Sequence, residues 1–305
     1  MTSTRRTLLH HEVAGTLSVI IATIAAGLNI YLAKVLSFIS GLLLASITLT
    51  SAGLILTLVN AFLRNLDEML NCIRKHPLKI LWIGIIGTAI PINMIFYGLH
   101  LSPISNTFLL QMEVIYSIFL SRMLLGERIS LQQALLSILA FFGVFLITSE
   151  GTLRGISTGD LLFLLAPFFF QCGHVIAKNL MRVINPITVV TYRLLTSGLS
   201  SLLISTLIGL NPLGGVGNMT LRDTVTIFCL SLSYAIGNSF WYYGIKNLNL
   251  SKATAIIITY PIIPVVLAII TLEEKLTIIK SIGIIMVFFS VIELSLLRST
   301  DGRNS

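Results

Sequence analysis

Long apolar runs separated by short polar corners occupy nearly the whole chain. Most runs have about the 20 residues that one helix needs to cross a bilayer. They predict ten membrane-spanning helices, at 13–34, 40–62, 78–101, 104–125, 130–149, 159–180, 186–209, 223–245, 252–272 and 276–297. Because the corners are short, we expect successive helices to run antiparallel. The fold class expected is therefore an all-α membrane protein.

The pattern of the first half returns in the second. Residues 105–130 and 251–277 are each an apolar run that ends in a charged corner, and they align at an offset of 147. Smaller offsets of 144 to 146 align the earlier runs, with these matches: Gly15 and Gly159, Ala33 and Ala177, Gly53 and Gly198, Ala89 and Ala235, Gly98 and Gly244. The chain is thus predicted to contain two repeats, at residues 1–151 and 152–305.

Five spans in each repeat have a consequence for topology. Since five is odd, the second repeat must enter the membrane from the side opposite to the first. Inverted repeats of this kind are common in secondary transporters, whose substrate sites lie near the bilayer midplane between the repeats.

Composition supports the membrane prediction. Charged residues make up 10% of the chain and the mean hydropathy is +0.95, whereas soluble domains are about 25% charged. This leaves little room for a soluble domain. The net charge of +8 comes from cations placed singly between apolar runs. That distribution fits membrane lipids with anionic headgroups and argues against nucleic acid as a partner.

The same cations predict the orientation. With the N-terminus inside, fourteen lysines and arginines fall in cytoplasmic segments and five outside. The cytoplasmic fourteen are Arg5, Arg6, Arg64, Arg74, Lys75, Lys79, Arg122, Arg128, Lys178, Arg182, Lys246, Lys252, Arg298 and Arg303. The positive-inside rule then places both termini in the cytoplasm of a multi-pass protein of the inner or plasma membrane.

Several classes of chemistry lack their sequence signals. The three cysteines, Cys72, Cys172 and Cys229, have no metal-ligand spacing. There is no Gly-Lys-Ser phosphate loop, so ATP is not expected to drive the process. We therefore expect no cofactor, no metal site and no enzymatic activity.

Glu113 is the main candidate for a functional residue. It lies near the middle of the fourth predicted span, where an unpaired charge in lipid costs several kcal/mol. An α-helix would place Asn106, Glu113, Ser117 and Ser121 on one face. The functional interpretation is a carboxylate that couples transport to a proton or binds a cation. The alternative is a neutral carboxyl that hydrogen-bonds a neighbouring helix.

Arg193 lies about a third of the way along the seventh predicted span. It could pair with Glu113 or receive an anionic substrate. It could equally extend to the cytoplasmic headgroups, because arginine side chains near a helix end often do so.

Polar and aromatic side chains form stripes on three further spans. The candidates for a solute pocket are Asn93 and Tyr97 on the third span, His174 on the sixth, and Asn238, Trp241 and Tyr242 on the eighth. Aromatic rings beside amides suit an organic solute, since they offer apolar area with a few directing hydrogen bonds. The same residues could instead be packing contacts or interface belts.

Three segments also carry a family resemblance. Residues 96–130 (FYGLHLSPISNTFLLQMEVIYSIFLSRMLLGERIS), 159–180 (GDLLFLLAPFFFQCGHVIAKNL) and 241–277 (WYYGIKNLNLSKATAIIITYPIIPVVLAIITLEEKLT) resemble the EamA-type permeases of the drug/metabolite transporter superfamily. The resemblance covers nearly the whole chain and implies a transporter. Two departures are that Val114 replaces an expected proline and that Thr48 stands opposite Arg193.

Together these features predict a transporter or exporter of a small organic metabolite, such as an amino acid or drug-like solute, that works by alternating access as a monomer or homodimer. The alternative is an intramembrane lipid-modifying enzyme that uses Glu113 or His174 as a base. The duplication disfavours an enzyme, because a single chemical step does not need a two-fold pathway.

Overall fold

The computed structural model describes residues 2–116, 130–149, 156–207, 219–248, 253, 256–257 and 259–301. These residues form helices and connecting turns, with no strand among them. The helices are α1 (Thr2–Val35), α2 (Gly41–Phe62), α3 (Leu66–Lys75), α4 (Pro77–Gly84), η1 (Ile85–Ala89), α5 (Ile90–Leu101), η2 (Ile104–Met112), α7 (Leu131–Ser149), α8 (Thr158–Leu180), α9 (Pro186–Leu207), α10 (Leu221–Asn247), α12 (Ile262–Thr271) and α13 (Ile278–Asp301).

Five stretches of the described chain are long and apolar enough to cross a membrane. They are Val13–Val35, Gly41–Phe62, Pro77–Leu101, Thr158–Leu180 and Pro186–Leu207. Helices α7, α10, α12 and α13 correspond to four further predicted spans, and each begins or ends within two residues of its span. The all-helical membrane fold expected from the apolar runs is therefore present, and most of the described helix ends lie close to the predicted corners.

Polar side chains set the beginnings of several helices. Ser157 and Asp160 form a capping box at the start of α8, and Thr220 and Asp223 form another at the start of α10. In each box the two side chains bond the backbone N–H groups that the first turn leaves without helical partners. Ser40 caps α2 through a bond from Leu43 N. Polar corners in the sequence thus mark where these three long helices start.

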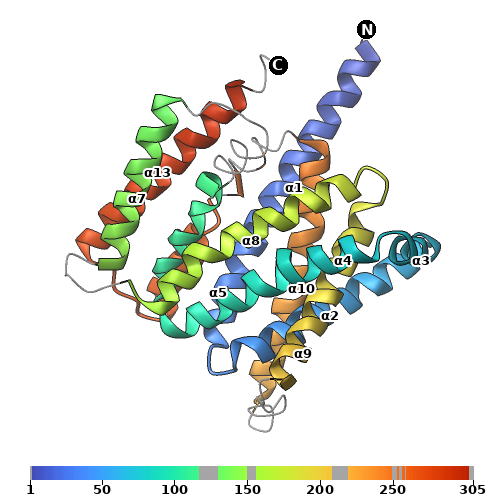
Figure 1. Cartoon of the computed structure of the whole chain (residues 1–305), viewed down its shortest axis with the longest axis horizontal. Coiled ribbons are helices and arrows are strands. Elements are labelled where there is room, and N and C mark those ends of the chain that lie inside the picture. The colour runs from blue at the N-terminus through green and yellow to red at the C-terminus, as the bar shows by residue number, and fades with distance from the viewer. Residues whose placement is uncertain are drawn as a thin grey trace.

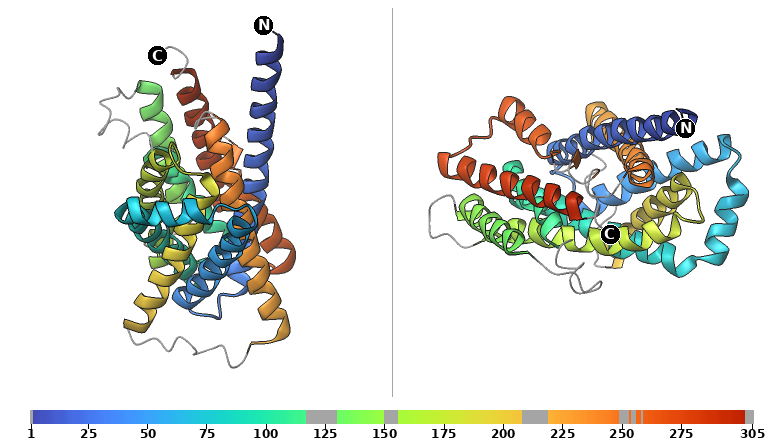
Figure 2. Two further views of the ribbon diagram at one scale, coloured as in Figure 1. Left: turned by 90° about the vertical axis from the view of Figure 1, so that its right-hand side faces the viewer. Right: turned by 90° about the horizontal axis from the view of Figure 1, so that it is seen from above.

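Helices from the two ends of the chain pair with one another. Helix α1 packs along α10, α2 along α9, α5 along α8, and α7 along α13. Figure 1 shows the α7–α13 pair on one flank of the bundle, and α1, α2, α9 and α10 on the other. Helix α1 begins and α13 ends at the same end of the molecule (Figure 2). Because helices of the two halves pack together, residues of both halves can line the cavity described below.

Two glycines permit a close crossing between η1 and α8. A Cβ on Gly173 of α8 would lie 2.4 Å from the Gly87 Cα of η1, and a Cβ on Gly87 would lie 2.5 Å from the Gly173 Cα. The obstacle in each direction is backbone, which cannot rotate away. Small residues let membrane helices approach this closely and pack their backbones together.

The structure differs from the expected helices in three places. A short amphipathic helix, α3, occupies the corner between the second and third spans. A π-helical turn, η1, interrupts the third span between α4 and α5. Residues 104–112 form the 3₁₀ helix η2 rather than an α-helix, so the predicted polar stripe is wrong there. With about 3.0 residues per turn instead of 3.6, Asn106 and Glu113 no longer share a face.

Some sequence predictions fall outside the described residues. These are Ser117 and Ser121 of the predicted stripe, the corner 126–129, and parts of the fourth and ninth predicted spans at 117–125, 252, 254–255 and 258.

The glycine crossing generates a prediction about stability. Gly173→Val should lower the melting temperature of the purified protein, since overpacking a fitted contact typically costs about 1–3 kcal/mol. Val175→Leu is the control, because Val175 is on the same helix and 51% exposed. Thermal unfolding in detergent measures both variants. Equal melting temperatures for the two would contradict a backbone contact at Gly87.

Candidate functional site

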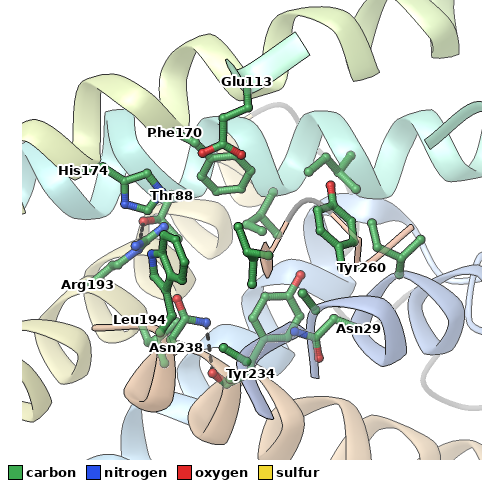
Figure 3. Close-up of a pocket in the computed structure, with 18 of the residues that line it drawn as sticks. Asn29, Thr88, Glu113, Phe170, His174, Arg193, Leu194, Tyr234, Asn238 and Tyr260 are labelled. Carbon is green, nitrogen blue, oxygen red and sulfur yellow. Dashed lines mark hydrogen bonds between the residues drawn. The ribbon is translucent and has the colours of Figure 1, made fainter. Parts of the chain in front are cut away.

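A cavity of about 160 Å³ lies inside the bundle, and both halves of the chain contribute to its wall (Figure 3). Its polar lining residues are Asn29, Thr88, Glu113, His174, Arg193 and Asn238, and its aromatic lining residues are Phe96, Phe170, Tyr234, Trp241 and Tyr260. The remaining wall is aliphatic or small. A mostly apolar cavity with a few convergent polar groups is typical of a binding site for a small organic molecule.

Arg193 is the central charged group of this cavity. The side chain is only 4% exposed. Its Nε donates to Thr88 Oγ1 at 2.6 Å, one Nη donates to the Tyr242 hydroxyl, and the other donates to the Gly87 carbonyl at 3.3 Å. The guanidinium also lies 5.3 Å from the ring centre of Tyr242 and 6.0 Å from that of Phe170. Of the alternatives considered for Arg193, extension to the cytoplasmic headgroups is wrong, because its side chain is buried in the bundle.

The π-helical turn η1 explains how neutral groups are available to hold this cation. Pro91 follows four residues after Gly87 and has no N–H, so the Gly87 carbonyl lacks its α-helical donor. That carbonyl accepts from Arg193 instead. The Thr88 hydroxyl donates to the Ile83 carbonyl at 3.0 Å, which leaves its oxygen to accept from Arg193. Such π turns are frequent at functional sites.

Glu113 lies on another part of the cavity wall. Its Oε1 accepts from Gln171 Nε2 of α8 at 2.7 Å. Figure 3 shows its carboxylate above the Phe170 ring, while His174 and Arg193 lie to one side and Tyr260 to the other. No ion pair joins Glu113 to Arg193 within the described part of the chain. The cavity therefore contains a carboxyl and a guanidinium that are each held by neutral partners.

Aromatic contacts order the side chains between these two groups. His174 stacks on Phe170 with ring centres 6.3 Å apart, and it meets Trp241 edge-on at 6.2 Å. Its buried Nδ1 has no hydrogen-bond partner among the described residues. Asn238 Nδ2 donates to the Tyr234 carbonyl at 2.9 Å, one turn earlier on α10. Rings that pack on one another leave little rotamer freedom, so the wall is shaped before any solute enters.

The cavity brings together five of the eight predicted site residues: Glu113, His174, Arg193, Asn238 and Trp241. Tyr242 is fully buried behind the wall and holds Arg193. Asn93 lies outside the cavity, where its Nδ2 donates at 2.7 Å to both the Ala89 carbonyl and Ser201 Oγ. Tyr97 is 52% exposed and is not part of the lining. The stripes on the sixth and eighth spans thus contribute to the cavity, whereas Asn93 and Tyr97 of the third span do not.

Several lining residues were not among the predicted site residues. Asn29 is the one amide between residues 13 and 33, and Thr88 is the one polar side chain between residues 83 and 92. An isolated polar residue in an apolar run was therefore an available signal. Phe170 and Tyr260 had no such signal, since aromatic residues are common throughout membrane helices.

A second polar cluster lies farther along α1, five residues beyond Asn29. Lys34 Nζ donates to the Leu99 carbonyl at 2.6 Å and to the Ser102 carbonyl at 3.0 Å. Glu274, which follows α12, accepts from Ile104 N at 3.0 Å and from Ser105 N at 2.9 Å. A cation thus binds the carboxyl end of α5 and a carboxylate binds the amino end of η2, as the helix dipoles favour.

The beginning of helix α8 also binds residues of the turn between α5 and η2. Asn106 Nδ2 donates to Asp160 Oδ1 at 2.5 Å, and the hydroxyls of Ser102 and Ser157 are 3.0 Å apart. We call Lys34, Asp160 and Glu274, together with residues 102–106 that they bind, the corner clasp. Its three charged members come from segments far apart in the chain, so it ties both halves together at one end of the bundle.

The profile of the EamA-like transporter family matches residues 13–149 and 157–296 of this chain. The chain belongs to the EamA-like transporter family. That family is part of the drug/metabolite transporter superfamily, so the protein is a multi-pass membrane transporter. The resemblance found in the quoted segments is confirmed, and family and relatives favour transport over the enzyme alternative.

Individual relatives agree with the EamA assignment. The chain is 24% identical over 232 residues to the "Uncharacterized transporter YyaM" of Bacillus subtilis, covering 73% of this chain and 74% of that protein. It is 24% identical over 290 residues to an "Uncharacterized transporter" of Methanothermobacter thermautotrophicus, covering 89% and 83%. One crystal structure shares the fold with a TM-score of 0.65 at 16% identity, over 94% of this EamA protein and 97% of that chain.

The Arg193 contacts generate a prediction that has a matched control within the chain. Thr88→Val should lower the free energy of unfolding by about 1–3 kcal/mol, because a buried charged donor loses its acceptor. Thr48 is also fully buried, but its hydroxyl has no hydrogen-bond partner among the described residues. Thr48→Val should therefore be neutral or stabilising. Unfolding by graded denaturant separates the two. Equal losses would mean that the Thr88 hydroxyl does not support Arg193.

Proposed function

We propose that this EamA protein moves a small organic metabolite across the cell membrane by alternating access. The supporting observation is the cavity itself, which has walls from both halves of the chain and a buried guanidinium beside a carboxyl. Groups that would be costly to bury in a static scaffold are explained if a polar solute passes between them. Movement of such a solute needs no nucleotide and no chemical step.

The lining suggests what kind of solute fits. Arg193 uses Nε and one hydrogen on each terminal nitrogen for the protein, which leaves two N–H groups to bind an oxygen of the solute. Glu113 can accept from a cationic group or exchange a proton. The rings of Phe170, Tyr234 and Trp241 offer flat apolar area between them. An amino acid or a metabolite with one acidic and one basic or polar end matches this arrangement.

For the architecture we propose ten spans in two inverted repeats. Two sets of glycine contacts support this proposal. A Cβ on Gly98 would meet Phe163 at 2.7 Å and the Gly159 carbonyl at 3.2 Å. A Cβ on Gly244 would meet Val19 at 2.5 Å and the Gly15 carbonyl at 3.5 Å. These residues correspond in the sequence alignment of the halves, at offsets of 144 for α1 and α8 and 146 for α5 and α10.

A further pair of contacts repeats in the same way at the crossing of α2 and α9. Gly53 faces Leu195, and Gly198 faces Thr50. The offset of 145 relates Gly53 to Gly198 and Thr50 to Leu195. Contacts that recur between corresponding residues are what two repeats related by a two-fold axis would produce.

Alternating access requires that one end of the bundle be closed while the other is open. The corner clasp supplies a closed end, because Lys34, Asp160 and Glu274 all bind residues 102–106. Opening that end would break these bonds and separate α1, α8 and α12 from the corner. We propose that the clasp faces the outside, since the positive-inside rule places the end of α1 there.

Substitutions that distinguish the cavity from the outer surface test the proposed function. Trp241→Ala should abolish solute flux into sealed vesicles carrying the purified protein, because it removes an aromatic wall. Tyr97→Ala should leave flux close to wild type, because that ring lies on the outer surface. Both variants should keep their melting temperatures within a few degrees. Loss of flux in Tyr97→Ala alone would contradict the cavity as the path.

Proton coupling has its own test at Glu113. The amide oxygen in Glu113→Gln can still accept from Gln171, so the fold should be preserved, but the side chain no longer carries a proton. We expect net, gradient-driven uptake to fall at least tenfold while exchange of solute across the membrane continues. Wild-type net uptake should vary with pH. Unchanged net uptake in the variant, with the wild-type pH dependence, would make this carboxyl structural.

A further inference from the structure

Helix α3 connects two helices that are long and apolar enough to cross the membrane. The stretch Gly41–Phe62 ends just before it, and Pro77–Leu101 begins just after it. One helix leaves the bilayer and the next enters it within this short interval, so α3 must lie near the level of the lipid headgroups. Figures 1 and 2 show it at the edge of the bundle.

The side chains of α3 divide into three faces. Met69 and Cys72 are buried against the protein, and the pKa of the Cys72 thiol is raised to about 11 by that burial and by Glu68. Leu66, Leu70 and Ile73 are 47%, 53% and 44% exposed and follow the i, i+4, i+7 spacing of one helical face. The polar residues Asp67, Asn71 and Lys75 occupy the third face.

An aligned row of exposed aliphatic residues beside a polar face is typical of a helix that lies in the membrane interface. Two apolar residues that flank α3 are also exposed, Phe62 at 88% and Leu78 at 79%. In water each of these side chains would lose the hydrophobic stabilisation that acyl chains provide. The occupant that fits this face is the bilayer in which the protein resides.

The charges around α3 select the type of lipid. Arg64, Arg74, Lys75 and Lys79 are all exposed, and the only carboxylates between them are Asp67 and Glu68. Glu68 accepts from Asn185 N and so faces the protein. We propose that α3 is a docking site for anionic phospholipid, in which Leu66, Leu70 and Ile73 enter the acyl boundary and the four cations bind headgroup phosphates.

The site has direct contacts with the elements that hold Arg193. The Tyr192 hydroxyl donates to the Met69 carbonyl at 2.8 Å, and Tyr192 is the residue before Arg193. At its other end α3 leads through His76 into α4 and η1, which supply the Gly87 and Thr88 contacts. Lipid bound at α3 would therefore stabilise α9, which carries Arg193, and η1, which supplies two of its three partners.

The experiment uses the full chain in nanodiscs of phosphatidylcholine alone or of phosphatidylcholine mixed with phosphatidylglycerol, without solute. Phosphatidylglycerol should raise the melting temperature of the wild type. Arg74→Gln/Lys75→Gln should lose about 2–4 °C of that increase per neutralised cation, at low salt. The reason is that phosphate binding at α3 is electrostatic, and high salt should remove the difference.

Arg222→Gln/Lys275→Gln is the matched control, because it removes two exposed cations at the other end of the bundle. Both double variants are measured in nanodiscs of the same lipid composition. It should keep most of the wild-type increase. An equal loss in both double variants, or no effect of phosphatidylglycerol on the wild type, would overturn the proposal. Should the double variant fail to fold, Lys75→Gln alone answers the same question. The readout is independent of transport, so it stands whether or not flux is found.

Discussion

A buried guanidinium held by neutral groups is the interaction on which the rest of this structure depends. Removing a charge from water costs several kcal/mol unless good hydrogen bonds replace the lost hydration. Arg193 obtains them from Thr88, the Gly87 carbonyl and the Tyr242 hydroxyl. Those three partners require the π turn of the third span and the close packing of α10 on α9. A shift of either element would remove at least one of these acceptors from a buried charge.

Neutral partners also determine what the cavity can bind. Had a carboxylate paired with Arg193, the two charges would largely cancel, and the cavity would attract no anionic group. Within the described residues the guanidinium has hydroxyl and carbonyl acceptors instead, so its positive potential remains available. Glu113 is likewise held by an amide, Gln171, rather than by a cation. The separation of these two groups is the basis on which we propose a solute with two different polar ends.

The proposed duplication explains the scaffold, and divergence between the halves explains the chemistry. The offset of 147 relates Glu113 to Tyr260, and the offset of 146 relates Ile92 to Asn238 and Ile95 to Trp241. All six residues line the cavity. Corresponding glycines keep the helices packed in both halves, whereas corresponding lining positions differ in polarity. With the proposed two-fold symmetry, similar scaffolds would thus enclose an asymmetric site.

The sequence by itself determined the membrane fold, the positions of most helices and the candidacy of Glu113, because hydrocarbon imposes length and polarity constraints that are local in the chain. The tertiary structure decided which polar stripes face the cavity and which face the protein surface or another helix. Tyr97 and Trp241 look alike in sequence, yet one ring is on the surface and the other lines the cavity. The direction of Arg193 and the 3₁₀ winding before Glu113 also depended on distant partners. Contacts between residues about 50 to 170 positions apart, such as Arg193 with Tyr242 or Glu274 with Ile104, leave no periodic signal in either segment.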